Sequence, residues 1–250
     1  MTIVELIALP GAGKTTLYSA LSKSRPGSGL RLRLQEEVVL QAALPHRLWV
    51  LLAIGFWLFP SLRANKVVRS VATALIPSAY HRSIKMGTSD AIFGTSSLIA
   101  FTRALSAAGF RPRSPVERVN WFIRNLMAFD LCGQQSGLVI LDEGLVQRAH
   151  SLAMEGAPQS EVLEYLSTLP RSTICVHLCL PNEARIARLG GREGDNRERF
   201  SVDGETDAMS AILEYTRQIG IRVIELDASL MPSEISSNLI DQLSKQPMVE

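Results

Sequence analysis

The sequence predicts an α/β fold with three layers, in which helices cover both faces of a mostly parallel five-stranded sheet. Two observations predict it. Short apolar runs rich in β-branched residues alternate with segments of helical periodicity. Most of these runs are apolar at consecutive positions, which is typical of parallel strands covered on both faces. Of the 250 residues, 46% are hydrophobic and 20% are charged, which indicates a globular chain with a sizeable core.

The N-terminal segment predicts a strand, a glycine-rich loop and a helix. The run TIVELIAL is short and apolar, and KTTLYSALSKS follows the loop with helical periodicity. After a turn at residues 25–29, LRLRLQEEVVL alternates apolar and polar residues through Leu34. This alternation predicts a half-buried second strand. The acidic pair Glu36 and Glu37 then lies at the carboxyl end of that strand.

Residues 40–135 show only helical patterns, so we expect a helical insertion between strands 2 and 3. The expected helix breaks are Pro45, Pro60, Pro77 and Gly109. One helix is well marked in SPVERVNWFIRNLMAFDL, with Ser114 suited to the N-cap and Pro115 to the first turn. We expect a single domain, residues 1–250, that carries this insertion.

The second half of the chain predicts three more strands. They are the apolar runs GLVILDEG, STICVHLCL and IRVIELDAS. A helix, a break and a second helix are expected in residues 151–170. A further helix ends at Gly220, which suits a helix C-terminus, and a last helix runs from about residue 232 to 244.

The three cysteines do not form a disulfide framework. Cys175 and Cys179 fall in one predicted strand, about 13 Å apart, which is beyond disulfide reach. We therefore expect a reducing, cytoplasmic compartment. The glycine-rich loop begins within ten residues of Met1, which leaves no room for a secretory signal. The formal net charge of +2 does not favour a nucleic-acid partner, and we expect none.

Residues 48–62, LWVLLAIGFWLFPSL, raise a membrane question because they carry no charge between Arg47 and Arg63. The run is shorter than the roughly 20 apolar residues of a spanning helix, and Pro60 interrupts it. A buried helix is the first interpretation. The alternative is an interfacial helix, which would make the protein peripheral to a membrane.

The loop PGAGKTT has the residue types of a phosphate-binding loop. Two glycines let backbone N–H groups turn around phosphate oxygens, and the helix behind them adds its positive N-terminus. The lysine places a charge on the β- and γ-phosphates, and the first threonine offers a hydroxyl to Mg²⁺. Ala8 stands where the usual pattern has its first glycine, which is acceptable where φ is negative. We expect ATP or another nucleoside triphosphate to bind at Pro10, Gly11, Ala12, Gly13, Lys14, Thr15 and Thr16.

With three further motifs, the chain resembles P-loop NTPases of the nucleoside/nucleotide-kinase-like group, which includes thymidylate and deoxynucleoside kinases. The motifs LPGAGKTT, LQEEV, VILDEGLVQRA and an arginine-rich stretch after the fourth predicted strand come in the order of that group. The resemblance covers most of the chain outside residues 40–135. In those kinases the helices of this region wall the acceptor pocket. Apolar helices there imply a large or lipid-like acceptor, or a protein or membrane partner.

The end of the third predicted strand carries two acids. Asp142 resembles the Walker B aspartate that holds Mg²⁺ through water, with a helix N-cap as the alternative. Glu143 stands where thymidylate-kinase-like proteins commonly have an arginine. This difference favours a hydroxyl-bearing acceptor over a phosphorylated one, or a water-activating role. Arg148 either replaces the missing positive charge or is an ordinary surface arginine.

The resemblance also places a catalytic glutamate at the end of the second strand, where Glu36 and Glu37 stand. A base there accepts or orients the hydroxyl proton of the acceptor. Val38 replaces the proline that those kinases have after the acid, and a solvated acidic turn is the alternative.

Residues 182–200 are rich in arginine and glycine, and the resemblance implies a lid that closes over the phosphates. Arg188 and Arg192 are spaced for the same helix face, so we expect both to act on the transferring phosphoryl group. A solvated basic helix is the alternative. Residues 226–229, LDAS, are where related kinases contact the nucleotide base.

The sequence thus predicts an ATP-dependent, Mg²⁺-requiring phosphotransferase that acts on a hydroxyl group of a small molecule or lipid. The alternative is a regulatory or assembly ATPase that signals through the insertion, which an acid after Asp142 supports. A GTPase and an ABC ATPase are disfavoured, because the Asn-Lys-x-Asp and Leu-Ser-Gly-Gly-Gln motifs are missing from the sequence. Thr15 and Asp142 are the expected Mg²⁺ residues. The expected catalytic residues are Lys14, Glu36, Glu37, Asp142, Arg188 and Arg192.

Overall fold

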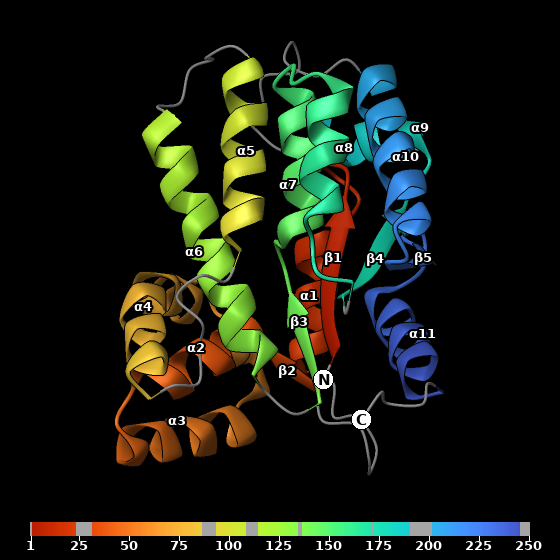
Figure 1. The fold of residues 1–250 in the computed structure, drawn as a ribbon. Coiled ribbons are helices and arrows are strands. Elements are labelled where there is room, and N and C mark those ends of the chain that lie inside the picture. The colour runs from red at the N-terminus through yellow and green to blue at the C-terminus, as the bar shows by residue number, and fades with distance from the viewer. Residues whose placement is uncertain are drawn as a thin grey trace.

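The core of the protein is a parallel five-stranded sheet with the order β2-β3-β1-β4-β5 (Figure 1). Every neighbouring pair of strands is parallel, which confirms the predicted fold class. The strands are β1 (Thr2–Ala8), β2 (Leu32–Leu34), β3 (Leu138–Leu141), β4 (Thr173–Cys179) and β5 (Arg222–Asp227). The computed structural model describes residues 2–23, 32–86, 94–108, 115–134, 137–171, 173–190 and 202–245.

Helices cover both faces of the sheet because the residues of each strand alternate between two apolar cores. On β1, Val4 and Leu6 pack against one helical layer, and Ile3 and Ile7 pack against the other. The first layer holds α1 (Lys14–Lys23) and α11 (Pro232–Ser244). The second holds α7 (Leu145–Met154), α8 (Gln159–Ser167) and α10 (Val202–Gln218), and α9 (Asn182–Gly190) follows β4. These layers form the three-layer arrangement that the apolar runs predict.

The insertion packs beside the β2 edge of the sheet (Figure 1). A stacked pair, Phe101 and Phe122, lies at its centre with ring centroids 4.0 Å apart, and Tyr165 of α8 packs edge-on against both rings. The insertion is therefore joined to the main core. Its helices are α2 (Gln35–Ala43), α3 (His46–Leu58), the 3₁₀ helix η1 (Pro60–Ala64), α4 (Lys66–Lys85), α5 (Thr95–Ala107) and α6 (Pro115–Gly133).

Most predicted boundaries are confirmed. Pro45 and Pro60 separate helices, α6 begins at Pro115, and the last helix spans the predicted residues. Gly220 has a φ of +85° just after α10, the left-handed conformation that a glycine provides at a helix end. The three cysteines are free. Gly109 and Ser114 lie outside the described residues.

The prediction of a break at Pro77 is wrong, because this proline lies inside the continuous helix α4. Proline removes one backbone donor, so the carbonyl of Thr73 loses its helical partner. Both residues lie on the exposed side of α4. Water can satisfy that carbonyl there, and the helix continues.

The second strand is shorter and more buried than its alternating pattern predicts. β2 has three residues, and all of them are buried, including Arg33. The guanidinium of Arg33 donates a hydrogen bond to Gln41 Oε1 of α2. Because the insertion helices cover this edge of the sheet, the side that the pattern assigns to solvent is enclosed.

The interpretation of residues 48–62 as a buried helix is also wrong. In α3 only Phe56 is buried, and Leu51 and Trp57 are 66% and 63% exposed. The helix packs on α2 and η1 alone, so it can bury only one stripe of its surface. Within the described ranges, no helix is long and apolar enough to cross a membrane.

Candidate active site

The glycine-rich loop between β1 and α1 has the backbone that its residues predict. Gly11 and Gly13 have φ values of +87° and +96°, a region that side chains disfavour. The Ala12 N–H donates to the Leu9 carbonyl over 3.1 Å, and the Leu17 N–H donates to the Gly13 carbonyl over 2.9 Å. Among the described residues only glycines have positive φ, so Ala8 fits its strand without strain.

A cavity of about 640 Å³ opens over this loop. Lys14 is half-buried in its wall, and three further basic or hydroxyl-bearing loop or helix residues, Thr15, Arg118 and Arg148, also face it. Six of the seven predicted nucleotide residues line this cavity, and the seventh, Ala12, is buried beneath the loop. The cations and the exposed N–H groups at the start of α1 suit an anionic phosphate chain.

The helix α7, opposite the loop, is fixed to β1 by a buried carboxylate. Glu5 Oε1 accepts a hydrogen bond from the Gln147 N–H over 2.7 Å, and the Ala8 N–H donates to Gln147 Oε1 over 3.1 Å. Gly144 begins the helix because a Cβ there would lie 2.2 Å from Glu5 Cδ. Burial raises the pKa of Glu5. Glu5 thus replaces the missing N-cap side chain and positions the residues of α7 that face the loop.

Arg148 is a largely buried part of this wall, so its interpretation as an ordinary surface arginine is wrong. Its guanidinium lies 3.5 Å from the centre of the Trp121 ring and pairs with Glu143 over 2.6 Å. Burial lowers its pKa, although the charge of Glu143 acts in the opposite direction. The cation–π contact and the ion pair hold Arg148 at the edge of the loop cavity.

A second cavity, of about 280 Å³, lies between the insertion and the end of β3. Glu36 and Asp142 line it together with the indole of Trp121. Glu143 lines both this cavity and the one over the loop, so the two cavities adjoin at that residue. The remaining polar residues of the second cavity are Gln35, Lys66, Arg69, Ser70, Thr73, Arg124 and Asn125.

Arg69 of α4 joins the two sequence-predicted acids in the second cavity. Its guanidinium pairs with Glu36 over 3.2 Å and also with Asp142 Oδ2. Tyr18 donates its hydroxyl to the other oxygen of Glu36, and Arg69 lies over the Tyr18 ring. Burial raises the pKa of Glu36, and the hydrogen bond from Tyr18 works against this rise. Sequence reasoning missed Arg69, since no motif surrounds it.

The two neighbouring glutamates have different environments. Glu36 faces the second cavity, whereas Glu37 pairs with Arg63 of η1 over 2.9 Å and lines neither cavity. Both are in the first turn of α2, where successive side chains point in different directions. The sequence left open which acid acts, and the geometry favours Glu36.

The predicted lid begins with α9, which packs on the loop. The Arg188 guanidinium donates to the Ala228 carbonyl over 3.1 Å, and a Cβ placed on Gly13 would lie 3.6 Å from its Nη1. Arg188 is therefore beside the loop, as its spacing predicts, and it also contacts the LDAS segment. Arg192 and the rest of the predicted lid, from residue 191 to 200, lie outside the described residues.

Arg185, one helical turn earlier, has a different role. It is 1% exposed and pairs over 2.6 Å with Glu205 of α10, whose side chain is fully buried. Its Nη1 also lies 3.5 Å from the Pro10 carbonyl of the loop. Arg185 therefore joins α9, α10 and the loop from below.

A methyl group at Gly11 tests this packing. In Gly11→Ala the new Cβ would lie 2.9 Å from Leu189 Cγ and 3.0 Å from the Arg185 carbonyl, at a φ of +87°. We expect weaker ATP binding and a loss of about 1–3 kcal/mol of stability. Calorimetric titration and thermal unfolding measure both. Gly133→Ala, where a Cβ meets nothing within 4 Å, is the matched control.

The predicted Mg²⁺ residues fit a hard cation. Asp142 is buried, and its Oδ1 has no hydrogen-bond partner among the described residues, while Oδ2 accepts from Arg69. The hydroxyl of Thr15 is exposed in the loop cavity. An unpartnered carboxylate oxygen and a hydroxyl are the donors that Mg²⁺ prefers.

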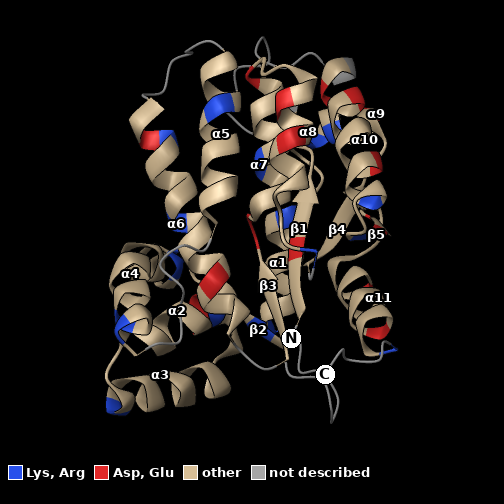
Figure 2. Ribbon diagram, viewed as in Figure 1, with Lys and Arg blue, Asp and Glu red and all other residues tan. Residues whose placement is uncertain are grey.

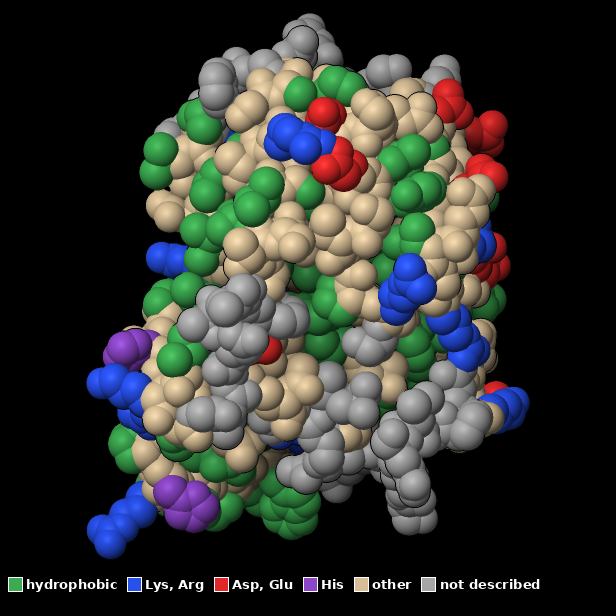
Figure 3. Space-filling model, viewed as in Figure 1, with side chains coloured by type: hydrophobic (Ala, Val, Ile, Leu, Met, Phe, Trp, Pro, Cys, Tyr) green, Lys and Arg blue, Asp and Glu red, His purple; other side chains and the backbone are tan. Residues whose placement is uncertain are grey.

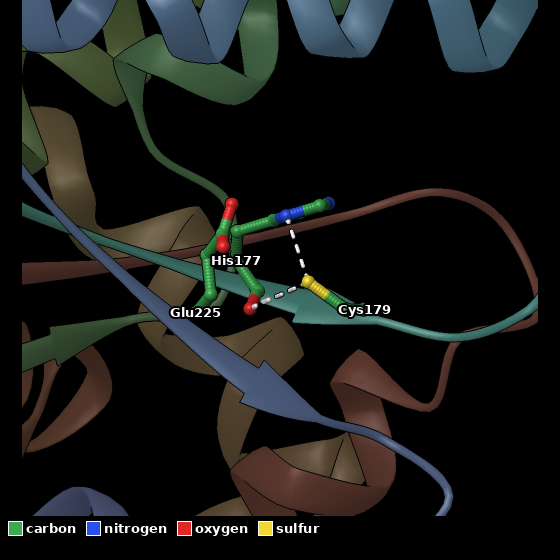
Figure 4. A group of neighbouring side chains, drawn as sticks. All are labelled: His177, Cys179 and Glu225. Atoms are coloured by element: carbon green, nitrogen blue, oxygen red, sulfur yellow. Dashed lines mark hydrogen bonds between the residues drawn. The ribbon is translucent and has the colours of Figure 1, made fainter.

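A second group of metal-ligand types lies at the carboxyl ends of β4 and β5 (Figure 4). His177 Nδ1 is 3.2 Å from Cys179 Sγ, and the donor atoms of these two residues and Glu225 lie within 4.8 Å of one another. Nitrogen, sulfur and oxygen donors suit Zn²⁺. Glu225 already pairs with Arg217 over 2.6 Å, so a metal ion would have to displace that arginine.

Comparison with known proteins gives similarity of fold. No family model matches the chain, and no curated protein sequence matches it. Deoxyadenosine kinase from M. mycoides, solved with dCMP and dCDP, has 12% identity and a TM-score of 0.44, over 98% of this chain and 100% of that one. Its structure with dCTP has 11% identity and a TM-score of 0.41, with the same coverage of both chains. Shikimate kinase from Acinetobacter baumannii, solved with shikimate, has 12% identity and a TM-score of 0.43, over 99% and 96%.

Proposed function

We propose that this protein is an ATP-dependent, Mg²⁺-requiring phosphotransferase that acts on a hydroxyl group. The observation that carries the proposal is the meeting of two cavities at Glu143. One holds the phosphate-binding loop, and the other holds a buried carboxylate and an arginine. A donor and an acceptor placed in them would have their reacting groups side by side, which is the main requirement of phosphoryl transfer.

On the donor side, Lys14 and Arg188 lie closest to the expected phosphates. Lys14 is half-buried in the loop cavity, and Arg188 is beside Gly13. Both would stabilise negative charge on the γ-phosphoryl group, with Arg192 as the further residue that the sequence predicts. Thr15 and Asp142 would hold Mg²⁺, which neutralises charge on the β- and γ-phosphates.

On the acceptor side, Glu36 would orient the hydroxyl and accept its proton. The acceptor oxygen forms a bond to the γ-phosphorus, the bond between that phosphorus and the β–γ bridging oxygen breaks, and ADP leaves with the bridging oxygen. The proton passes to the Glu36 carboxylate and from there to solvent. Arg69 holds Glu36 in position and places a cation beside the transferred group.

The pH dependence of Glu36→Gln tests this role. Because burial raises the pKa of Glu36, the wild-type rate should rise with pH through a value above its usual 4.5. Glu36→Gln should lower kcat by roughly 100-fold and remove this acidic limb. Glu37→Gln changes the neighbouring acid, which lines neither cavity, and should keep the limb. Equal profiles for the two variants would exclude Glu36 as the base.

The acceptor is found by measuring transfer from ATP labelled at the γ-phosphate to a panel of nucleosides, sugars and lipid alcohols. We expect one class to be labelled at least tenfold faster than water. The cations Lys66, Arg69 and Arg124 and the indole of Trp121 give the second cavity a mixed character. An acceptor with both a polar and an apolar part fits this lining.

A regulatory ATPase is the second candidate, and Glu143 supports it. This acid faces the loop cavity and is held by Arg148, so it could position a water molecule against the γ-phosphate. ATP turnover that no acceptor in the panel increases, but that a protein or membrane stimulates, would favour this candidate. Glu143→Gln should then reduce turnover more than Glu36→Gln does.

A further inference from the structure

An exposed apolar surface covers α3 and η1, at the lower left of Figure 1. Trp57 and Phe59 are more than 60% exposed, and Leu51 is 66% exposed. These side chains surround most of the helix, because α3 contacts only α2 and η1. A continuous surface of this kind marks an interaction site. Its exposed large apolar residues are Leu48, Val50, Leu51, Ile54, Trp57, Leu58, Phe59 and Leu62.

The charge around this surface has one sign. Residues 38–86 contain six lysines and arginines and no aspartate or glutamate, although the whole chain has a net charge of only +2. Arg47, at the start of α3, and Lys66 and Lys85 of α4 are exposed. Figure 2 shows basic and no acidic positions on α3 and α4, and Figure 3 shows Lys, Arg and His side chains gathered at this corner. The surface therefore suits an anionic partner.

The same surface connects directly to the second cavity. η1 follows α3, and its Arg63 pairs over 2.9 Å with Glu37, the neighbour of the cavity residue Glu36. α4 follows η1, and its first turns place Lys66 and Arg69 in the cavity wall. Whatever contacts α3 and η1 is therefore close in the chain to the candidate acceptor site.

We infer that α3 and η1 lie in the headgroup region of an anionic phospholipid bilayer. If the proposed function holds, the acceptor is a hydroxyl carried by a membrane-borne molecule. At about 1.5 Å per residue, the 13 residues of α3 extend for only ~20 Å, whereas a bilayer core is about 30 Å thick. The helix therefore lies flat, with its apolar side chains among the acyl chains and Arg47 and Lys66 at the lipid phosphates.

Charge favours the bilayer over a second copy of this chain. Two copies that met through this surface would bring like charges together, which disfavours association. Lipid headgroups instead provide a layer of negative charge above an apolar region, in the same order as on the protein surface. Trp57 is also typical of the membrane interface, where an indole ring has one apolar and one polar side.

Vesicle flotation of the full chain, without nucleotide, tests the inference. We expect flotation with vesicles of phosphatidylcholine mixed with phosphatidylglycerol, weaker flotation with phosphatidylcholine alone, and weaker binding at high salt. Leu51→Ser/Trp57→Ser should lower the apparent affinity at least about tenfold. The control is Ile99→Ser/Val116→Ser, which changes two equally exposed apolar residues on α5 and α6. Arg47→Glu should weaken binding to the anionic vesicles only, and Lys23→Glu on α1 is its control.

Two results would overturn the inference. One is flotation that the double variant on α3 does not change, or no flotation of the wild type. The other is sedimentation that shows self-association of the wild type and a monomeric Leu51→Ser/Trp57→Ser variant, because a second copy would then cover the surface.

Lys14→Ala separates this inference from the proposed function. It should abolish transfer and float like the wild type. Flotation without transfer to any acceptor would contradict the kinase and leave the membrane contact standing. Transfer to soluble acceptors without flotation would do the reverse. With a vesicle-borne lipid alcohol as acceptor, the double variant should lose activity at least about tenfold and keep its activity on a soluble short-chain analogue.

Discussion

Lys14→Ala should lower kcat for phosphoryl transfer by about 100- to 1,000-fold, the usual effect of removing one charged or hydrogen-bonding group at a developing charge. Lys14 is half-buried in the loop cavity, at the first position of α1. There its ammonium group faces the expected β- and γ-phosphates from low-dielectric surroundings, where a charge acts more strongly than in water. Steady-state transfer from labelled ATP measures the effect.

The matched control for Lys14→Ala is Lys23→Ala, at the other end of the same helix. Lys23 is exposed and lines neither cavity, so kcat should change less than about twofold. Thermal unfolding should show that Lys14→Ala keeps a folded chain. A folded Lys14→Ala protein with undiminished transfer would exclude the roles that we give to the loop.

Arg185→Met should cause the largest loss of stability among the arginines after β4. The substitution leaves the carboxylate of Glu205 fully buried without the cation that pairs with it over 2.6 Å. Breaking a buried pair from one side costs about 3–5 kcal/mol. For a domain of this size that corresponds to a fall in Tm of roughly 6–20 °C, measured by circular dichroism.

Two variants complete this experiment. Arg188→Met removes an exposed arginine three residues later, and its Tm should stay within about 2 °C of the wild type while transfer falls. Arg185→Met/Glu205→Leu should recover most of the lost stability, because an apolar pair of similar volume often replaces a buried ion pair without loss. If the two single variants unfolded at the same temperature, the buried pair would have no special role in holding α9 to α10.

Local signals account for the elements that the sequence predicted well. The loop at residues 10–16 requires positive φ at two positions, and Gly11 and Gly13 are the residues that permit it. The same reasoning places the end of α10 near Gly220. The order of apolar runs and helices predicts a parallel sheet, because such runs must be covered on both faces. These features depend on neighbours in the chain.

Other features depend on residues that the fold brings together over long distances. Arg69 pairs with Glu36 and Asp142, which lie 33 and 73 residues away in the chain. Nothing in the sequence around Arg69 marks it. Arg185 belongs to the same arginine-rich stretch as Arg188, yet only the position of α10 makes it a buried structural residue. Pro77 is tolerated because of its exposed place on α4.

The sequence by itself determined the sheet, the phosphate-binding loop and the region in which the acids and arginines of the site would be found. Its signals there are backbone requirements and apolar periodicity, which neighbouring residues set. Only the tertiary structure decided that Glu36, and not Glu37, faces the cavity, that Arg69 completes it, and that residues 48–62 are exposed. Each of these depends on which other element packs against a side chain, and a one-dimensional pattern of apolar residues does not contain that information.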